Sequence, residues 1–158
     1  MNGEKTEPIV TIGIPAYNGE KTITRTIDSI LSQTILNFKL VISDDGSTDS
    51  TPKICREYEQ RDSRIKYIQQ NKNKGWIKNW TFLAENSDTK YFVWISDDDY
   101  WEPQFLEKNI EVLETNPKIV GSISNVQLVG PNIKNYYPNQ KEINSTESNF
   151  KFILVRSI

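Results

Sequence analysis

Three consecutive aspartates, Asp97 to Asp99, follow Ser96 directly after an apolar run over residues 91–95. Two carboxylates about 4 Å apart repel each other by about 4 kcal/mol at an effective dielectric constant near 20, so a fold that holds them together needs a compensating charge. The nearest basic residues along the chain are Lys90, before the run, and Lys108, well after it. A divalent cation from solution would supply the missing charge. Capping of a helix N-terminus is the alternative, and it explains one or two of the aspartates better than three.

The amino-acid composition narrows the choice of metal and of chemistry. The chain contains no histidine and one cysteine, Cys55. It therefore cannot assemble a Ser-His-Asp or Cys-His catalytic pair or a histidine-rich zinc site. Carboxylates and water favour hard ions, so Mg²⁺ or Mn²⁺ is expected in place of zinc. A single cysteine cannot form an internal disulfide, which fits a cytoplasmic location, with peripheral association at a membrane left open.

Length and charge exclude several classes of partner. The 158 residues correspond to about one domain, and the net charge of −2 implies no particular partner. The sequence has no basic tract of the kind that binds nucleic acid. It also has no run of 18 apolar residues, so we expect no membrane span. Residues 1–8 form a polar N-terminal arm without the apolar core of a secretory signal.

Hydrophobic patterns typical of strands and helices alternate along the chain. Strands are expected over residues 9–14, 38–42, 65–68, 91–95 and 119–129, and helices over residues 20–33, 75–85 and 103–115, with a further helix that has Pro52 in its first turn. Helices between successive strands predict an α/β fold with a mainly parallel central sheet and helices on both faces. The apolar patch at residues 150–155 could begin either a strand or a helix.

Polar loops follow three of these strands. They are residues 15–18 after the first strand, Asp44 and Asp45 after the second, and residues 96–99 after the fourth. In parallel sheets, ligands bind beyond the carboxyl ends of the strands, so these loops predict a common site. The glycine-rich phosphate loops Gly-x-x-x-x-Gly-Lys-Ser/Thr and Gly-x-Gly-x-x-Gly are absent from the sequence. A metal ion held by carboxylates could neutralise a nucleoside diphosphate without such a loop.

These motifs, in this order and spacing, resemble those of family 2 glycosyltransferases with the GT-A fold. The resemblance extends from about residue 9 to residue 129 and rests on Ile-Pro-Ala-Tyr-Asn at 14–18, Asp-Asp-Gly-Ser-Thr-Asp at 44–49, Asn73, Gly75, Asn79-Trp80, Ser-Asp-Asp-Asp at 96–99, Pro103 and Phe105-Leu106. Many members have aspartate where this chain has Ser96. The resemblance implies a Rossmann-like nucleotide-sugar-binding domain over residues 9–130, with the start of an acceptor-side region at 131–158.

The resemblance also implies contacts with the nucleoside. Pro15, Ala16 and Tyr17 would form a wall and backbone contacts around it, and Asp45, or its neighbour Asp44, would accept a hydrogen bond from the base. From the residues alone, Asp44 and Asp45 also fit a structural turn, and Tyr17 could pack against Pro15.

The resemblance also implies a role for each of the three aspartates in the acidic run. By resemblance, Asp97 would approach the ribose, Asp98 would hold the metal that bridges the diphosphate, and Asp99 would support the metal through water. This matches the Asp-x-Asp metal motif of the family, although the Ser96 substitution leaves the assignment of individual aspartates open. The donor implied is a nucleotide-diphosphate sugar, with a UDP-sugar first among the candidates.

The family places its catalytic base, an Asp or Glu, on a later segment together with most acceptor contacts. Glu142 and Glu147 lie in the tail without a supporting pattern, so we expect a donor-binding half without its base. The acceptor implied is the hydroxyl of a saccharide or glycolipid, with inversion at the transferred sugar. Two other hypotheses are a non-catalytic nucleotide-binding or interaction module and a nucleotidyltransferase. The latter normally needs a basic, glycine-containing loop after the first strand, which residues 15–21 do not provide.

Overall fold

The structure is a computed structural model that describes residues 7–115, 118, 120–123 and 153–156. Its elements, in chain order, are β1 (Val10–Ala16), α1 (Ile23–Leu31), β2 (Phe38–Asp44), α2 (Thr51–Arg61), β3 (Ile65–Gln69), α3 (Trp76–Glu85), β4 (Tyr91–Trp94), α4 (Phe105–Thr115), β5 (Gly121–Ile123) and β6 (Ile153–Arg156). Among the described residues, no helix has the length and apolar character needed to cross a membrane.

The strands form one six-stranded sheet in the order β3-β2-β1-β4-β6-β5. The four strands β1 to β4 are parallel, and β6 pairs antiparallel with both β4 and β5. The predicted α/β fold with a mainly parallel sheet is thus confirmed. The apolar patch near the end of the chain supplies strand β6, and the predicted domain boundary at residue 130 lies outside the described residues.

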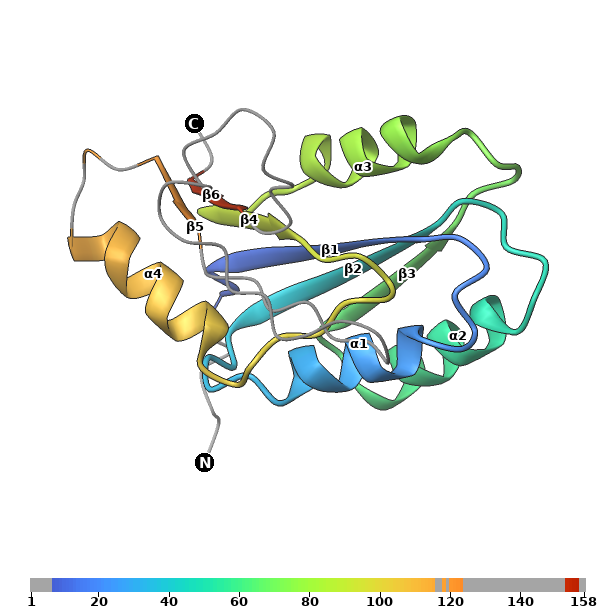
Figure 1. The fold of residues 1–158 in the computed structure, drawn as a ribbon, viewed down its shortest axis with the longest axis horizontal. Coiled ribbons are helices and arrows are strands. Elements are labelled where there is room, and N and C mark those ends of the chain that lie inside the picture. Colours follow the sequence, from blue (N-terminus) through green and yellow to red (C-terminus); the bar gives the residue numbers. More distant parts are fainter. Residues whose placement is uncertain (1–6, 116–117, 119, 124–152, 157–158) are drawn as a thin grey trace, which may run out of the picture.

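Helices cover both faces of the sheet (Figure 1). Helices α1, α2 and α4 pack on one face, where the isoleucines of α1 and the leucines of α4 join the alternate residues Ile12, Ile14, Leu40 and Ile42 in the main core. Helix α3 lies on the other face, where Leu83 packs against Val41 and Phe92. This arrangement leaves the carboxyl ends of the parallel strands to the loops that were predicted to form the site.

The first two strands extend further toward the site than their sequences suggest. A stop at Pro15 was predicted for β1, yet the strand continues to Ala16. The pairing of β1 with β4 ends at Gly13. Pro15 has no amide hydrogen, but at this position β4 offers no partner for one, so no hydrogen bond of the sheet is lost. Strand β2 continues through Ser43 to Asp44. The predicted fifth strand is described only as β5, and residues 124–129 lie outside the described residues.

Helical spacing predicts that Trp76, Trp80 and Leu83 lie on one side of the helix and pack inward, and for Trp76 this prediction is wrong. Trp76 is 72% exposed, whereas Leu83 is buried. Trp76 is the first residue of α3, ahead of the turns that pack against the sheet. Trp80 is half-buried, and its carbonyl accepts a hydrogen bond from the Trp94 indole at 3.0 Å.

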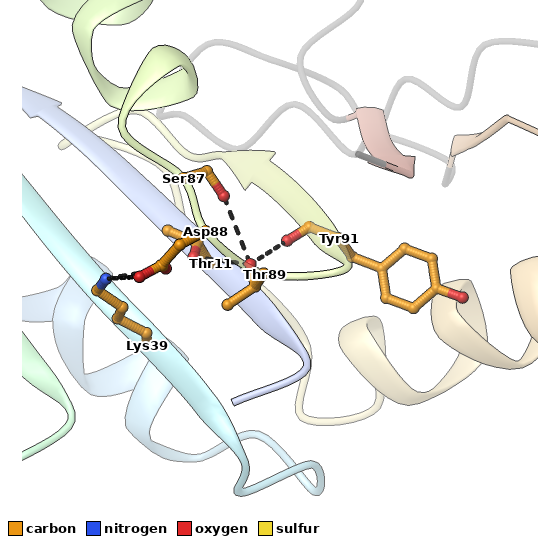
Figure 2. A network of polar contacts seen from close by, with 6 residues as sticks. All are labelled: Thr11, Lys39, Ser87, Asp88, Thr89 and Tyr91. Carbon is orange, nitrogen blue, oxygen red and sulfur yellow. Dashed lines mark hydrogen bonds and ion pairs between the residues drawn. The ribbon is translucent and has the colours of Figure 1, made fainter. Parts of the chain in front are cut away.

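A hydroxyl network at the start of β4 fixes this strand against its neighbours, at the end of the sheet opposite to the predicted site (Figure 2). The hydroxyl of Thr89 donates to the Tyr91 carbonyl at 2.7 Å and lies 2.8 Å from the hydroxyl of Thr11 on β1. The adjacent Asp88 pairs with Lys39 of β2 at 3.0 Å. These contacts support the register that places the acidic run beyond β4 at the site edge.

Replacing Thr11 with valine should destabilise the fold without touching the site. The Thr89 proton is used on the Tyr91 carbonyl, so Thr11 is the donor in the buried threonine pair. Loss of one such bond costs about 1 kcal/mol. Urea unfolding should therefore show a lower midpoint with an unchanged slope, and an unaltered midpoint would contradict the role given to this network.

Candidate functional site

The loops after β1 and β2 hold each other in place at the carboxyl edge of the sheet. The Asn18 amide donates to the Ser47 hydroxyl at 2.8 Å, and the Asn18 side-chain oxygen accepts from the Thr48 amide at 2.9 Å. Asn18 has a φ of 53°, in the left-handed region that asparagine tolerates better than most residues. Two of the three polar loops predicted to converge are therefore joined by hydrogen bonds.

Asp97 links the loop after β4 to the loop after β1. One of its carboxylate oxygens accepts the Tyr17 amide hydrogen at 3.1 Å. A Cβ atom at Gly19 would lie 2.6 Å from the same oxygen, so the absence of a side chain at Gly19 makes room for the carboxylate. Burial raises the pKa of Asp97, and the neighbouring Asp98 adds to the rise. The fold thus accepts an unfavourable, partly buried charge at this position.

Asp98 is more exposed than its two neighbours in the acidic run. Asp98 is exposed, and no described residue donates a hydrogen bond to its carboxylate, whereas Asp99 is half-buried. A turn bond from the Asp99 amide to the Ser96 carbonyl, at 3.2 Å, closes the loop. The described residues contain no group of three or more acidic, cysteine or histidine side chains arranged around a metal position. A cation bound by Asp98 and Asp99 would take its remaining ligands from outside this set of described side chains.

The sequence patterns did not identify one basic residue that lies near the acidic run. Arg25 of α1 donates to the backbone carbonyl of Asp98 at 2.7 Å, and its guanidinium lies 5.0 Å from the centre of the Tyr100 ring. It is distant in sequence, and only the adjacency of β1 and β4 brings it close. Because Arg25 donates to the backbone carbonyl of Asp98, the side-chain carboxylate of Asp98 keeps its lone pairs for a ligand.

Asp44 and Asp45 are both buried and hydrogen-bonded within the protein. Asp44 accepts from the Tyr67 hydroxyl at 2.6 Å and from the Ser47 amide at 2.8 Å. The two oxygens of Asp45, which is 3% exposed, accept from the amides of Lys74 and Gly75 at 2.8 and 2.9 Å. Asp45 therefore anchors the entry to α3, where Gly75 has a φ of 91°. Each carboxylate oxygen retains a second lone pair for a further donor.

The last two residues of β1 and the residue that follows them differ in exposure. Pro15 and Ala16 are buried, and the Ala16 carbonyl accepts the Asp45 amide hydrogen at 2.9 Å. Tyr17 is 50% exposed and offers a free ring surface at the edge of the site. A cleft of about 300 Å³ opens nearby beside α3, lined by Gln70, Lys74, Lys78, Asn79, Thr81, Phe82 and Glu85. None of the predicted site residues lines this cleft.

Cys55 has the environment of an unreactive cysteine. It is buried in α2, and burial raises the pKa of its thiol to about 12. A thiol with such a pKa stays protonated at neutral pH and is a poor nucleophile.

Several solved structures share the fold of this chain. Crystal structures of S. aureus TarS 1-349 align over 93% of this chain with a TM-score of 0.74 and 21% identity, and over 67% in the complex with UDP-GlcNAc, with a TM-score of 0.63 and 26% identity. These alignments cover 46% and 31% of the TarS chain. The mannosyltransferase PcManGT from Pyrobaculum calidifontis, in complex with GDP-Man and Mn²⁺, aligns over 78% of this chain and 36% of its own, with a TM-score of 0.69 and 21% identity.

Sequence comparison agrees with the structural likeness. An Escherichia coli protein named UDP-Glc:alpha-D-GlcNAc-diphosphoundecaprenol beta-1,3-glucosyltransferase WfaP is 37% identical over 117 residues, which cover 74% of this chain and 45% of the relative. The chain thus spans less than half the length of each of these proteins. The sequence model of glycosyl transferase family 2 matches residues 11–156, and the chain belongs to that family.

Proposed function

We propose that this chain is the donor-binding part of a glycosyltransferase that binds a nucleotide-diphosphate sugar through Mn²⁺ or Mg²⁺ and transfers the sugar, with inversion, to an acceptor hydroxyl. Family membership supports sugar transfer. The complexes of TarS with UDP-GlcNAc and of PcManGT with GDP-Man and Mn²⁺ support the donor class and the use of a metal. The name of WfaP, which includes UDP-Glc, supports a uridine nucleotide.

The observation that carries the proposal is the exposed Asp98 carboxylate on a loop that is itself held at the carboxyl edge of the sheet. Mg²⁺ and Mn²⁺ bind through oxygen, and Mg²⁺ commonly takes one or two carboxylates together with substrate phosphates and water. A site of this type needs no three-carboxylate cage, which agrees with the lack of such a cage among the described residues. Asp98 would hold the metal, and Asp99 would support it through water.

The nucleoside would lie against Tyr17, with its ribose near Asp97 and its base near Asp45. The exposed Tyr17 ring supports a stacking contact, and the backbone at Pro15 and Ala16 would complete the wall. Asp45 would use the lone pairs that Lys74 and Gly75 leave free. A bound metal would neutralise the charge that develops on the leaving diphosphate.

The acceptor in this proposal is a saccharide or glycolipid hydroxyl, and we assign the general base to none of the described residues. In the tail, Glu142 and Glu147 have no supporting sequence pattern, so we expect the purified chain to hydrolyse the donor but to transfer little sugar. Incubation with UDP-glucose or UDP-GlcNAc and Mn²⁺ should release UDP slowly, with water as the acceptor, while transfer to sugars stays near background. Chromatography of nucleotide and sugar products measures both.

The alternative, a non-catalytic nucleotide-binding module, predicts nucleotide binding without any release of UDP from the donor. Rapid sugar transfer by this chain would contradict our assignment and would place a general base among residues 1–158. Asp88→Asn is a suitable control, because Asp88 lies in the network of Figure 2 away from the site and should leave hydrolysis unchanged.

A further inference from the structure

Helix α1 holds the backbone of the loop that carries the three aspartates. Figure 1 shows the chain leaving β4 and passing over α1 before it enters α4. The contacts come from one face of α1, through Arg25, Thr26 and Ser29, and they reach the backbone of Asp97, Asp98, Asp99 and Trp101. The site loop is thus attached to a regular element beneath it.

Thr26 makes the central contact in this set. Its hydroxyl lies 3.0 Å from the Asp97 carbonyl and 2.6 Å from the Asp99 carbonyl, and the side chain is completely buried. A hydroxyl carries one proton, so the two carbonyls share one donor. The carbonyl between them, that of Asp98, is held by Arg25 at 2.7 Å. All three aspartates therefore have their carbonyl groups turned toward α1.

The next turn of α1 extends the same attachment. Ser29 donates to the Thr26 carbonyl at 2.8 Å and accepts the Trp101 amide hydrogen at 3.2 Å. Trp101 is buried and stacks on Phe105 with 4.2 Å between ring centres, which anchors the far end of the loop in the core. The loop is consequently fixed at both ends and in the middle.

Among these contacts, that of Thr26 is the hardest to replace. Arg25 is exposed, so water can substitute for its bond to the Asp98 carbonyl. The Thr26 hydroxyl is buried between two carbonyls, and removing it leaves both without that donor in a place that solvent does not reach. A ligand group held by a rigid support binds with less loss of conformational freedom than one on a mobile loop.

We propose that Thr26 is a positioning residue for metal and diphosphate binding, because its hydroxyl fixes the backbone from which Asp98 reaches the ligand. This inference rests on the function proposed above. It assigns Thr26 no contact with the nucleotide, since its hydroxyl is engaged by the Asp97 and Asp99 carbonyls. A valine at this position keeps the shape of the side chain and removes the donor, whereas a serine keeps the donor.

The test compares Thr26→Val and Thr26→Ser by calorimetry of UDP binding in Mn²⁺ and in chelator, well below the melting temperature. We expect Thr26→Val to weaken Mn²⁺-dependent UDP binding about tenfold, equivalent to the loss of about 1.4 kcal/mol, and Thr26→Ser to restore it to near the wild-type value. Thr11→Val is the matched control, because it removes a buried threonine hydroxyl at the opposite end of the sheet and should leave the affinity unchanged.

Hydrogen exchange of the amides of residues 97–101 supplies a readout that does not depend on the ligand. Exchange should accelerate in Thr26→Val and stay slow in Thr26→Ser and Thr11→Val. If Thr26→Val keeps the wild-type UDP affinity and the wild-type exchange rate, the inference is overturned and the proposed function stands. The same holds if Thr11→Val loses as much UDP affinity as Thr26→Val. Failure of the wild-type chain to bind UDP with Mn²⁺ would instead overturn the proposed function, and unchanged exchange would then also remove the structural role of Thr26.

Discussion

Replacing Asp98 with asparagine should remove the metal-dependent part of nucleotide binding. The Asp98 carboxylate is exposed, and Arg25 bonds its backbone carbonyl and leaves the side chain available. Asparagine has nearly the same size but lacks the charge that attracts a divalent cation. Charge-assisted contacts are worth about 1.5–3 kcal/mol, so UDP affinity in Mn²⁺ should fall by about tenfold to a hundredfold. Calorimetric titration with UDP in Mn²⁺ and in chelator measures the difference.

The Asp98→Asn variant should keep the wild-type melting temperature, because no described residue donates to the carboxylate that it changes. Asp88→Asn again serves as the control, since it neutralises another exposed aspartate at the opposite end of β4. If Asp98→Asn binds UDP with the same dependence on Mn²⁺ as the wild type, the metal ligand has been assigned to the wrong aspartate, and Asp99→Asn becomes the variant to compare.

Replacing Asp45 with alanine should lower both the stability of the fold and its affinity for uridine nucleotides. The stability falls because the Lys74 amide loses its acceptor and the Gly75 amide keeps only the Asn73 side-chain oxygen, at a cost of about 1.5–3 kcal/mol. The affinity falls, by about tenfold or more, if Asp45 also accepts the imide hydrogen of a uracil ring through a charge-assisted bond. Thermal unfolding and calorimetry with UDP measure the two effects independently.

Comparison of UDP with CDP separates base recognition from a general disturbance of the loop. Uracil presents an N–H donor at ring position 3, where cytosine presents an acceptor. A loss in Asp45→Ala that affects UDP and spares CDP supports base recognition by this carboxylate. A lower melting temperature with unchanged UDP affinity would show that Asp45 only anchors the entry to α3, and the nucleoside would then have to be placed elsewhere.

The fold was largely predictable from the sequence because its elements have simple periodic patterns. The β-branched runs of β1 and β2 and the spacing of Ile23, Ile27 and Ile30 in α1 produce the strands and the helix that those patterns indicate. Details at the strand ends were not predictable. Whether β1 stops at Pro15 depends on where its neighbour β4 ends, and that is a property of the assembled sheet. The burial of Trp76 was predicted wrongly for a similar reason, since helical spacing does not reveal which turn of a helix extends past the sheet.

The site was predictable as a set of loops, although the individual contacts were not. The order of the strands brings the acidic run together with the loops after β1 and β2, as parallel strand ends require. The two neighbouring aspartates at 44 and 45 illustrate the limit. They turn to different partners, one to Tyr67 and the other to the start of α3, and neither partner follows from local sequence. Thr26 and Arg25 were missed because a helix residue that supports a distant loop leaves no motif.

We propose that this chain binds a nucleoside diphosphate through a divalent cation held at Asp98. Calorimetry of UDP binding to the purified wild-type chain, first with Mn²⁺ and then with excess chelator, tests it most directly. We expect a clear binding isotherm in Mn²⁺ and an affinity at least about tenfold weaker in chelator, because the diphosphate would otherwise meet the uncompensated carboxylates of the acidic run. Equal affinity for UDP in Mn²⁺ and in chelator would show that a divalent cation does not mediate UDP binding by this chain.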